Sequence, residues 1–165
     1  MIMIAIFYTS STGNSEEVAN KIAKELVDAK VFDLAKVGVD EIKKYDKIII
    51  GTSTWGEGEL QSDFEDIWDS FADIDFSGKK VALFGLGDQD SYSYNFCDAM
   101  GLIYNQIKQN SGTIIGEYVD DEYDFEESIA FRDNSFVGLA IDEDNQSDLS
   151  NNRIKTWCKS IKDIF

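Results

Sequence analysis

The sequence predicts an α/β fold, a doubly wound parallel sheet with helices on both faces. Short β-branched apolar runs alternate with amphipathic stretches at helical spacing, and polar turns follow three of these runs. Right-handed crossovers between parallel strands place helices on both faces of such a sheet. The 165 residues have the length of one domain, so we expect a single domain over residues 1–165.

The first strand and first helix are predicted on either side of one polar turn. Residues 1–7 are almost wholly apolar, as in a strand buried on both faces. Val18, Ile22 and Leu26 then recur at the spacing of a helix with one apolar face. The remaining elements alternate in the same way. We predict strands over residues 29–34, 47–51, 80–85 and 113–119, and helices over 40–45, 64–71, 96–107 and 151–164.

An acidic segment interrupts this alternation after the fifth predicted strand. Residues 120–135 carry six acidic side chains in their first eight positions, and residues 136–141 then read as strand again. We interpret residues 120–135 as an insertion that splits the fifth strand, whose two halves share one position in the sheet. The alternative is a separate hairpin at the sheet edge.

The turns after strands 1, 3 and 4 lie at the carboxyl edge of the predicted sheet, where open α/β sheets bind ligands. The first turn, residues 9–15, is rich in hydroxyls, contains Gly13 and ends at a helix N-terminus. Backbone N–H groups and the helix dipole favour an anion there, so we expect a phosphate. The turn lacks the lysine of a nucleoside-triphosphate loop. An ordinary helix cap, with Thr12 or Gly13 as N-cap, is the alternative.

Two aromatic residues lie in the other two turns, Trp55 in residues 52–59 and Tyr92 in residues 86–95. Aromatic side chains in glycine-rich polar loops at one sheet edge suggest a flat ligand stacked between them. Tyr94 is a competing candidate for the second stacking position. A phosphate at one end and a planar ring at the other describe a mononucleotide, and FMN suits this pattern best.

The composition narrows the function further. The chain contains no histidine, which removes the usual general base, so we expect a bound cofactor to supply the chemistry. Cys97 and Cys158 lack metal-ligand spacing and are expected to be reduced structural residues. A net charge of −17 disfavours binding to nucleic acid or anionic membranes and favours basic protein partners. With no long apolar run, we expect a cytoplasmic protein.

Several segments together resemble the long-chain flavodoxins. They are residues 9–15 (TSSTGNS), residues 54–63 (TWGEGELQSD), Gly87-Asp88-Gln89 with Tyr92 and Asn95-Phe96, and residues 138–148 (GLAIDEDNQSD). The resemblance covers essentially the whole chain. It implies a five-stranded sheet of order 2-1-3-4-5 with strand 5 split by the insertion. Thr9 and Gly56 depart from residues common in the family, which often has Gly and Asn there.

The resemblance implies a monomeric carrier of single electrons with non-covalent FMN and no catalytic residues. The implied partners are basic-surfaced redox proteins, such as a flavodoxin/ferredoxin reductase or a pyruvate-type oxidoreductase. The implied cofactor contacts are Ser10, Ser11, Thr12, Gly13, Asn14 and Ser15 around the phosphate; Trp55 and Tyr92 flanking the ring; and Ser53, Thr54, Gly56, Leu86, Gly87, Asp88, Asn95, Cys97 and Asp144 beside them. We also expect the acids Glu57, Glu59, Asp88, Asp90 and Asp144 near the ring.

Three other functions compete with this interpretation. An FMN-dependent NAD(P)H:quinone reductase would share the fold but needs nicotinamide and quinone sites, for which no dedicated residues are evident. A phosphoacceptor signalling domain needs acidic residues where this chain has hydroxyls and Trp55. Dinucleotide binding rests only on Gly85-Leu86-Gly87, which lacks the remaining glycine of that motif.

Overall fold

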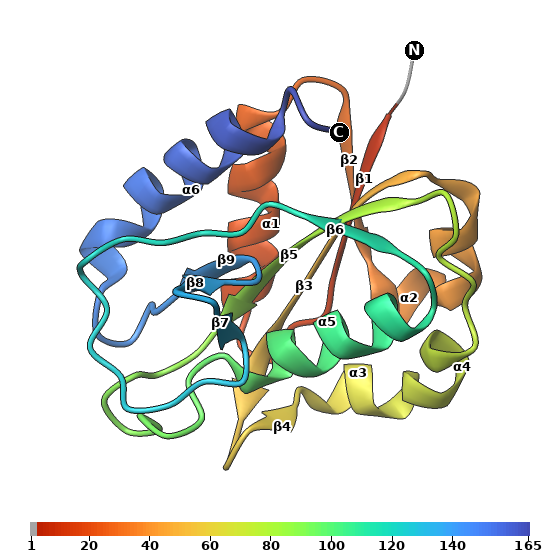
Figure 1. Ribbon diagram of the computed structural model, residues 1–165. Helices are drawn as coiled ribbons and strands as arrows, with labels where there is room; N and C mark the ends of the chain where they lie inside the picture. The colour runs from red at the N-terminus through yellow and green to blue at the C-terminus, as the bar shows by residue number, and fades with distance from the viewer. Residues whose placement is uncertain (1–2) are drawn as a thin grey trace.

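A parallel sheet runs through the centre of the molecule (Figure 1). It is seen in a computed structural model that describes residues 3–165. The main strands are β1 (Ile4–Tyr8), β2 (Ala29–Asp33), β3 (Lys47–Trp55), β5 (Lys80–Leu86) and β6 (Thr113–Ile115). They pair in the order β2-β1-β3-β5-β6, all in parallel. Counted along the chain, this is the order 2-1-3-4-5, and the predicted fold class is confirmed.

Helices cover both faces of this sheet (Figure 1). On one face, α1 (Asn14–Glu25) and α6 (Ser147–Ile161) bury side chains such as Ile22 and Trp157. On the other face, α3 (Ser62–Asp66), α4 (Trp68–Ala72) and α5 (Asp98–Gln109) enclose a second core. Strand β1 supplies both cores because successive side chains point to opposite faces: Phe7 enters one core and Ile6 the other.

The first elements differ from their predicted bounds by a few residues. Strand β1 begins at Ile4 because Met3 is exposed, and residues 1 and 2 of the predicted strand lie outside the described residues. Strand β2 ends at Asp33, whose Oδ1 accepts a hydrogen bond from the Ala35 N–H at 3.1 Å and caps α2 (Leu34–Val37). The helix predicted over residues 40–45 is the 3₁₀ helix η1 (Val39–Lys44).

The second polar turn is shorter than predicted because β3 continues through it to Trp55. The chain then folds back into β4 (Glu59–Leu60), which pairs antiparallel with the end of β3. Gly56 and Gly58 make the reversal with φ values of +51° and +93°, a region that glycine enters without steric penalty. Trp55 is therefore carried on the end of a paired strand rather than on a free loop.

Three predicted helices also change bounds. The helix predicted over residues 64–71 is divided into α3 and α4 at Ile67, whose backbone leaves the helical region with ψ of 3°. Helix α5 begins after Phe96 because Cys97 has a φ of +56° and precedes the first helical turn. The last helix, α6, begins four residues earlier than predicted and ends at Ile161.

The fifth sheet position is split as predicted. Strand β6 pairs with Lys80–Ala82 of β5, and β9 (Leu139–Ile141) pairs with Phe84–Leu86 of the same strand. Strand β6 is shorter than predicted because Gly116, with a φ of +83°, turns the chain away. A small hairpin of β7 (Phe131–Arg132) and β8 (Ser135–Phe136) forms inside the insertion, so β8 replaces the start of the predicted returning strand.

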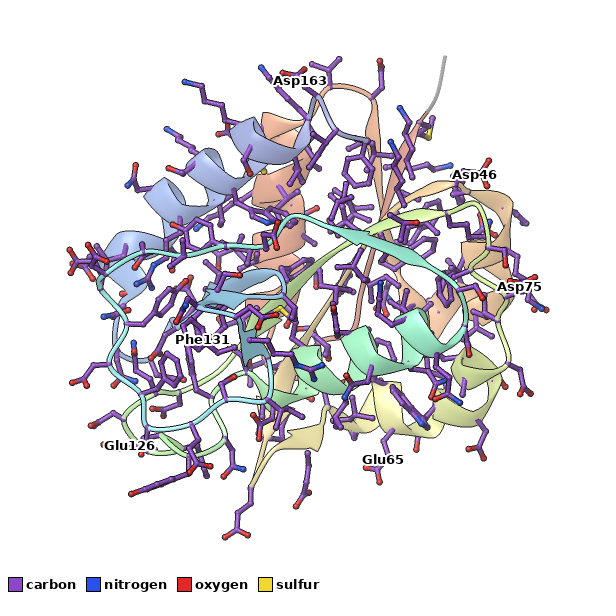
Figure 2. The ribbon with its side chains drawn as sticks, viewed as in Figure 1. Asp46, Glu65, Asp75, Glu126, Phe131 and Asp163 are labelled. Carbon is purple, nitrogen blue, oxygen red and sulfur yellow. The ribbon has the colours of Figure 1, made fainter. Side chains whose placement is uncertain are left out.

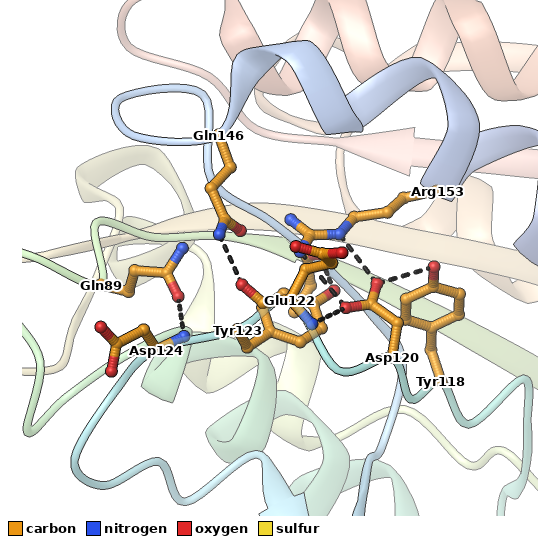
Figure 3. A network of polar contacts seen from close by, with 9 residues as sticks. Gln89, Tyr118, Asp120, Glu122, Tyr123, Asp124, Gln146 and Arg153 are labelled. Carbon is orange, nitrogen blue, oxygen red and sulfur yellow. Dashed lines mark hydrogen bonds and ion pairs between the residues drawn. The ribbon is translucent and has the colours of Figure 1, made fainter.

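The insertion is tied to the rest of the molecule through polar contacts (Figure 3). Arg153 of α6 is buried and donates from Nε to Oδ2 of Asp120 at 2.9 Å, and its guanidinium lies 4.0 Å from the centre of the Tyr123 ring. The Tyr123 hydroxyl donates to the Ala140 carbonyl at 2.6 Å. Figure 3 also shows Gln89, from the loop after β5, accepting from the Asp124 N–H at 2.6 Å.

Candidate functional site

A pocket of about 300 Å³ opens at the carboxyl ends of β1, β3 and β5. Four segments distant in sequence meet there, because all three strands end at the same edge of the parallel sheet. The lining residues are Thr12, Asn14, Ser15, Ser53, Thr54, Trp55, Gly56, Leu86, Gly87, Asp88, Tyr92, Glu143 and Asp144. Twelve of these thirteen were expected from the sequence to contact a cofactor.

One end of the pocket is the start of α1. Gly13, at a φ of +92°, is the N-cap, and no side chain caps the first helical turn. The first-turn N–H groups therefore lack the side-chain acceptor that usually satisfies them. The turn itself is held by a 2.9 Å hydrogen bond from the Gly13 N–H to Ser10 Oγ. This end offers backbone N–H groups, the hydroxyls of Thr12 and Ser15, and the positive end of a 12-residue helix.

The other end is formed by two partly exposed aromatic side chains. Trp55 is 44% exposed and Tyr92 is 45% exposed, and both line the pocket. The Trp55 indole donates to Ser53 Oγ at 2.7 Å, which holds the ring at the rim. Tyr94, the competing candidate, does not line this pocket and is 63% exposed elsewhere. Tyr92, and not Tyr94, therefore lines the same pocket as Trp55.

Acidic residues occupy the remaining wall. Burial, the largest single effect, raises the pKa of Asp88, but hydrogen bonds from the Ser91 N–H and hydroxyl, the Asn145 amide and the Asp90 N–H together outweigh it and lower the pKa. Burial raises the pKa of Asp144, and the nearby charges of Asp88 and Asp142 raise it further. The expected acids Glu57, Glu59 and Asp90 do not line the pocket and project into solvent.

Five of the predicted site residues do not line the pocket. Ser10 and Ser11 shape the turn before α1, and Ser11 Oγ accepts from Gln61 Nε2 at 2.8 Å. Gly13 contributes its backbone only. Asn95 donates from its amide to Asp98 Oδ2 at 3.0 Å. Cys97 is fully buried behind Gly87, where a Cβ would come within 2.9 Å of the Cys97 nitrogen.

Two residues important to this region are absent from the sequence-based site. Glu143 lines the pocket beside Asp144. Only its place in the acidic run at residues 142–144 of the sequence could have indicated this role. Asp142 is fully buried and accepts four hydrogen bonds from residues 89, 144 and 145. Its place directly after the returning strand gave no sign that its carboxylate holds two pocket loops together.

Other kinds of site receive no support. Within residues 3–165, no group of His, Cys, Asp and Glu side chains is arranged to hold a metal ion. No helix in the same range has the length and hydropathy needed to cross a membrane. Cys97 and Cys158 are free and buried, as predicted, and burial raises the pKa of both thiols, that of Cys158 to about 12. Neither is poised as a nucleophile.

The comparisons with known proteins agree with this geometry. A flavodoxin family model matches residues 6–157. The flavodoxin of Synechococcus elongatus is 46% identical, with 100% of this chain and 99% of that protein covered. Flavodoxin 1 of Escherichia coli is 43% identical over 99% of this chain and 94% of its own length.

Solved structures give the same result. The crystal structure of Fusobacterium nucleatum flavodoxin bound to flavin mononucleotide matches with a TM-score of 0.94 at 34% identity, covering 100% of this chain and 99% of that one. The oxidised flavodoxin 2 of Bacillus cereus matches with a TM-score of 0.74 at 25% identity over 99% of both chains. Sequence, fold and rim pocket lead to one conclusion: this chain belongs to the flavodoxin family.

Proposed function

We propose that this protein binds FMN non-covalently in the rim pocket and carries single electrons between redox proteins. The observation that carries this proposal is the joint geometry of the pocket: an uncapped helix N-terminus at one end and two partly exposed aromatic rings at the other. These features match the phosphate and the flat ring of one mononucleotide. The similar flavodoxin of Fusobacterium nucleatum was solved with flavin mononucleotide bound.

The residues present fit this cofactor. Thr12, Asn14 and Ser15 would hold the phosphate with neutral donors, and Trp55 and Tyr92 would stack on the ring. The FMN ring, when bound, supplies the one-electron chemistry. The protein would keep the ring in place, shield its faces from water and place the carboxylates of Asp88, Glu143 and Asp144 in the same pocket. Further contacts would come from the backbone of the turn at residues 10–13 and of Gly56 and Gly87.

The partners of this carrier are proposed to present basic surfaces. The net charge of −17 is distributed around the molecule, as the labelled acids Asp46, Glu65, Asp75, Glu126 and Asp163 illustrate in Figure 2. Such a field accelerates encounters with positively charged proteins and weakens as salt is added. A flavodoxin/ferredoxin reductase and a pyruvate-type oxidoreductase are the partner classes we propose.

Reconstitution tests the proposal directly. The cofactor-free protein should take up FMN with one-to-one stoichiometry, quench its fluorescence and then accept electrons one at a time in a reductive titration. Riboflavin, which has the ring but no phosphate, should bind much more weakly. No uptake of FMN, or equal affinity for riboflavin and FMN, would contradict the assignment of the two ends of the pocket.

A further inference from the structure

A second hollow, of about 330 Å³, lies beside the FMN pocket, between the loop after β5 and the insertion. It is lined by Tyr94, Phe125, Glu126, Glu127, Ser128, Ile129 and Phe131, and we call it the insertion groove. Its volume is at the lower end of the range for small-molecule sites, so it suits one or two side chains of a partner. Glu126 and Phe131 lie on the same side of the molecule in Figure 2.

The apolar part of the groove is rigidly supported. The Phe125 ring packs 5.5 Å from Phe96, 5.3 Å from Phe136 and 5.5 Å from Phe131, measured between ring centres. Phe96 and Phe136 are buried in the core. Tyr94, by contrast, keeps 63% of its exposure, so the fold makes little use of its ring. An exposed aromatic ring in the same hollow as a firmly packed one is a preformed surface for another group.

The rim of the groove is strongly acidic. Glu126 and Glu127 are exposed, and neither forms an ion pair with any residue in the range 3–165. Of the six acids in residues 120–127, only Asp120 is paired, with Arg153. The nearest basic residue of the insertion, Arg132, donates to the Ile129 carbonyl and lies over the Tyr104 ring outside the groove. The groove therefore presents two carboxylates that form no ion pair among residues 3–165, next to the exposed ring of Tyr94.

We propose that the insertion groove receives a lysine or arginine side chain of a redox partner protein. An aromatic face attracts a cation through its quadrupole, and two unpaired carboxylates within the same hollow add to that attraction. A neutral apolar side chain would leave both carboxylates without a partner, and an acidic one would be repelled. This inference rests on the proposed electron-carrier function, whose partner chemistry it specifies.

The position of the groove suits electron transfer. Tyr92 lines the FMN pocket and Tyr94 lines the groove, and two residues of chain separate their Cα atoms by at most about 7 Å. Between them, the Ser93 carbonyl accepts hydrogen bonds from the N–H groups of Glu126 at 2.8 Å and Glu127 at 2.9 Å. The groove and the pocket rim are thus one hydrogen-bonded unit. A partner anchored in the groove would be held beside Tyr92, which lines the FMN pocket.

The test uses the full FMN-loaded protein with oxidised cytochrome c, a lysine-rich redox protein, as the probe. The dissociation constant is measured by calorimetry or NMR at an ionic strength of about 0.05 M, where charge interactions reach farthest. We expect the double variant E126Q/E127Q to weaken the complex about fivefold, and Tyr94→Leu to weaken it about threefold. The matched control is E25Q/D163N, which removes the same charge from exposed positions at the opposite edge, where Figure 2 shows Asp163. It should weaken binding less than twofold.

Equal losses of affinity in E126Q/E127Q and in the control would show an effect of net charge only. That result would overturn the proposal that the partner binds in the insertion groove. No loss in Tyr94→Leu together with no loss in E126Q/E127Q would overturn it as well. The measurement also separates the two proposals, because an oxidised pair forms a complex without exchanging electrons. If the FMN proposal is wrong, the reconstitution shows no FMN uptake. If only the groove proposal is wrong, the groove variants bind FMN normally and keep their affinity for cytochrome c.

Discussion

The backbone N–H of Gln89 donates a 3.0 Å hydrogen bond to Oδ2 of Asp142, a carboxylate with no exposed surface. The same carboxylate accepts from the N–H groups of Asp144 at 3.1 Å and Asn145 at 3.0 Å, and from the Asn145 amide at 2.9 Å. Residues 86–88 and 143–144 form two walls of the FMN pocket. Asp142 therefore joins the two loops that carry those walls.

We expect Asp142→Ala to loosen both walls, because it leaves four donors without their acceptor. The free energy of unfolding should fall by about 3 kcal/mol, and FMN affinity should fall about tenfold. Urea unfolding and fluorescence titration measure the two effects. Asp75→Ala is the matched control, because Asp75 accepts only from Ser77 on the exposed surface. It should lower stability far less than Asp142→Ala and leave FMN affinity intact, because Asp75 is exposed. Equal effects in both variants would refute the joining role.

The aromatic end of the pocket is tested by truncation. Trp55→Ala and Tyr92→Ala should each weaken FMN binding about tenfold, since each removes apolar contact and a stacking energy of about 0.5–1.5 kcal/mol. Tyr94→Ala supplies the control, because Tyr94 does not line the pocket. Its FMN dissociation constant should match that of the unmodified protein. If a variant carrying both Trp55→Ala and Tyr92→Ala bound FMN normally, the proposed stacking would be wrong.

The acidic wall should control the potential at which the flavin becomes negatively charged. A charge about 8 Å away contributes about 2 kcal/mol at an effective dielectric of about 20, or about 90 mV for one electron. Water and salt weaken this charge effect at an open rim. We therefore expect Asp88→Asn and Asp144→Asn each to raise the midpoint potential of the step that makes the flavin negative by about 30–90 mV. Spectroelectrochemistry measures the shift. Asp163→Asn, far from the pocket, should change it by less than about 10 mV; a shift as large as those at the wall would argue against the local effect.

The Arg153–Asp120 pair links the insertion to α6 and should contribute to stability at neutral pH. Asp120→Asn leaves the buried Arg153 guanidinium without its counter-charge, and we expect unfolding free energy to fall by about 3 kcal/mol. Burial, the largest single effect, raises the pKa of Asp120, but the hydrogen bonds from Arg153, the Glu122 N–H and the Tyr118 hydroxyl, together with the Arg153 charge, outweigh it and lower the pKa below the usual 3.8. The stabilisation is therefore present above pH 3.8 and lost as pH falls through the lower folded value.

Chemical unfolding at about pH 7 and again near pH 2 measures this difference, and the variant and the unmodified protein should converge at the lower pH. Asp40→Asn is the control, since Asp40 pairs with Lys43 on the surface at 2.8 Å. Water and salt screen an exposed pair of this kind, so its loss should change stability little. An Asp120→Asn loss no larger than that of the control would mean that the buried pair does not hold the insertion in place.

Much of the fold could be read from local patterns. Continuous apolar runs such as that of β3 require a strand buried on both faces, and the spacing of Val18 and Ile22 requires a helix with one apolar face. The element ends were harder to predict, because they depend on single backbone angles. Cys97 and Gly116, both at positive φ, set the start of α5 and the end of β6. Side-chain identity alone does not reveal such angles.

The site divides in the same way. The hydroxyl-rich turn before α1 and the two rim aromatics are local features, so the sequence by itself determined the choice of FMN and the proposal of a phosphate end and a ring end. Only the tertiary structure decided that Tyr92 and not Tyr94 lines the pocket, that Glu143 joins its wall and that Asp142 ties two loops together. Those facts depend on contacts between residues more than fifty positions apart, which form only when the parallel strands bring their carboxyl ends to one edge.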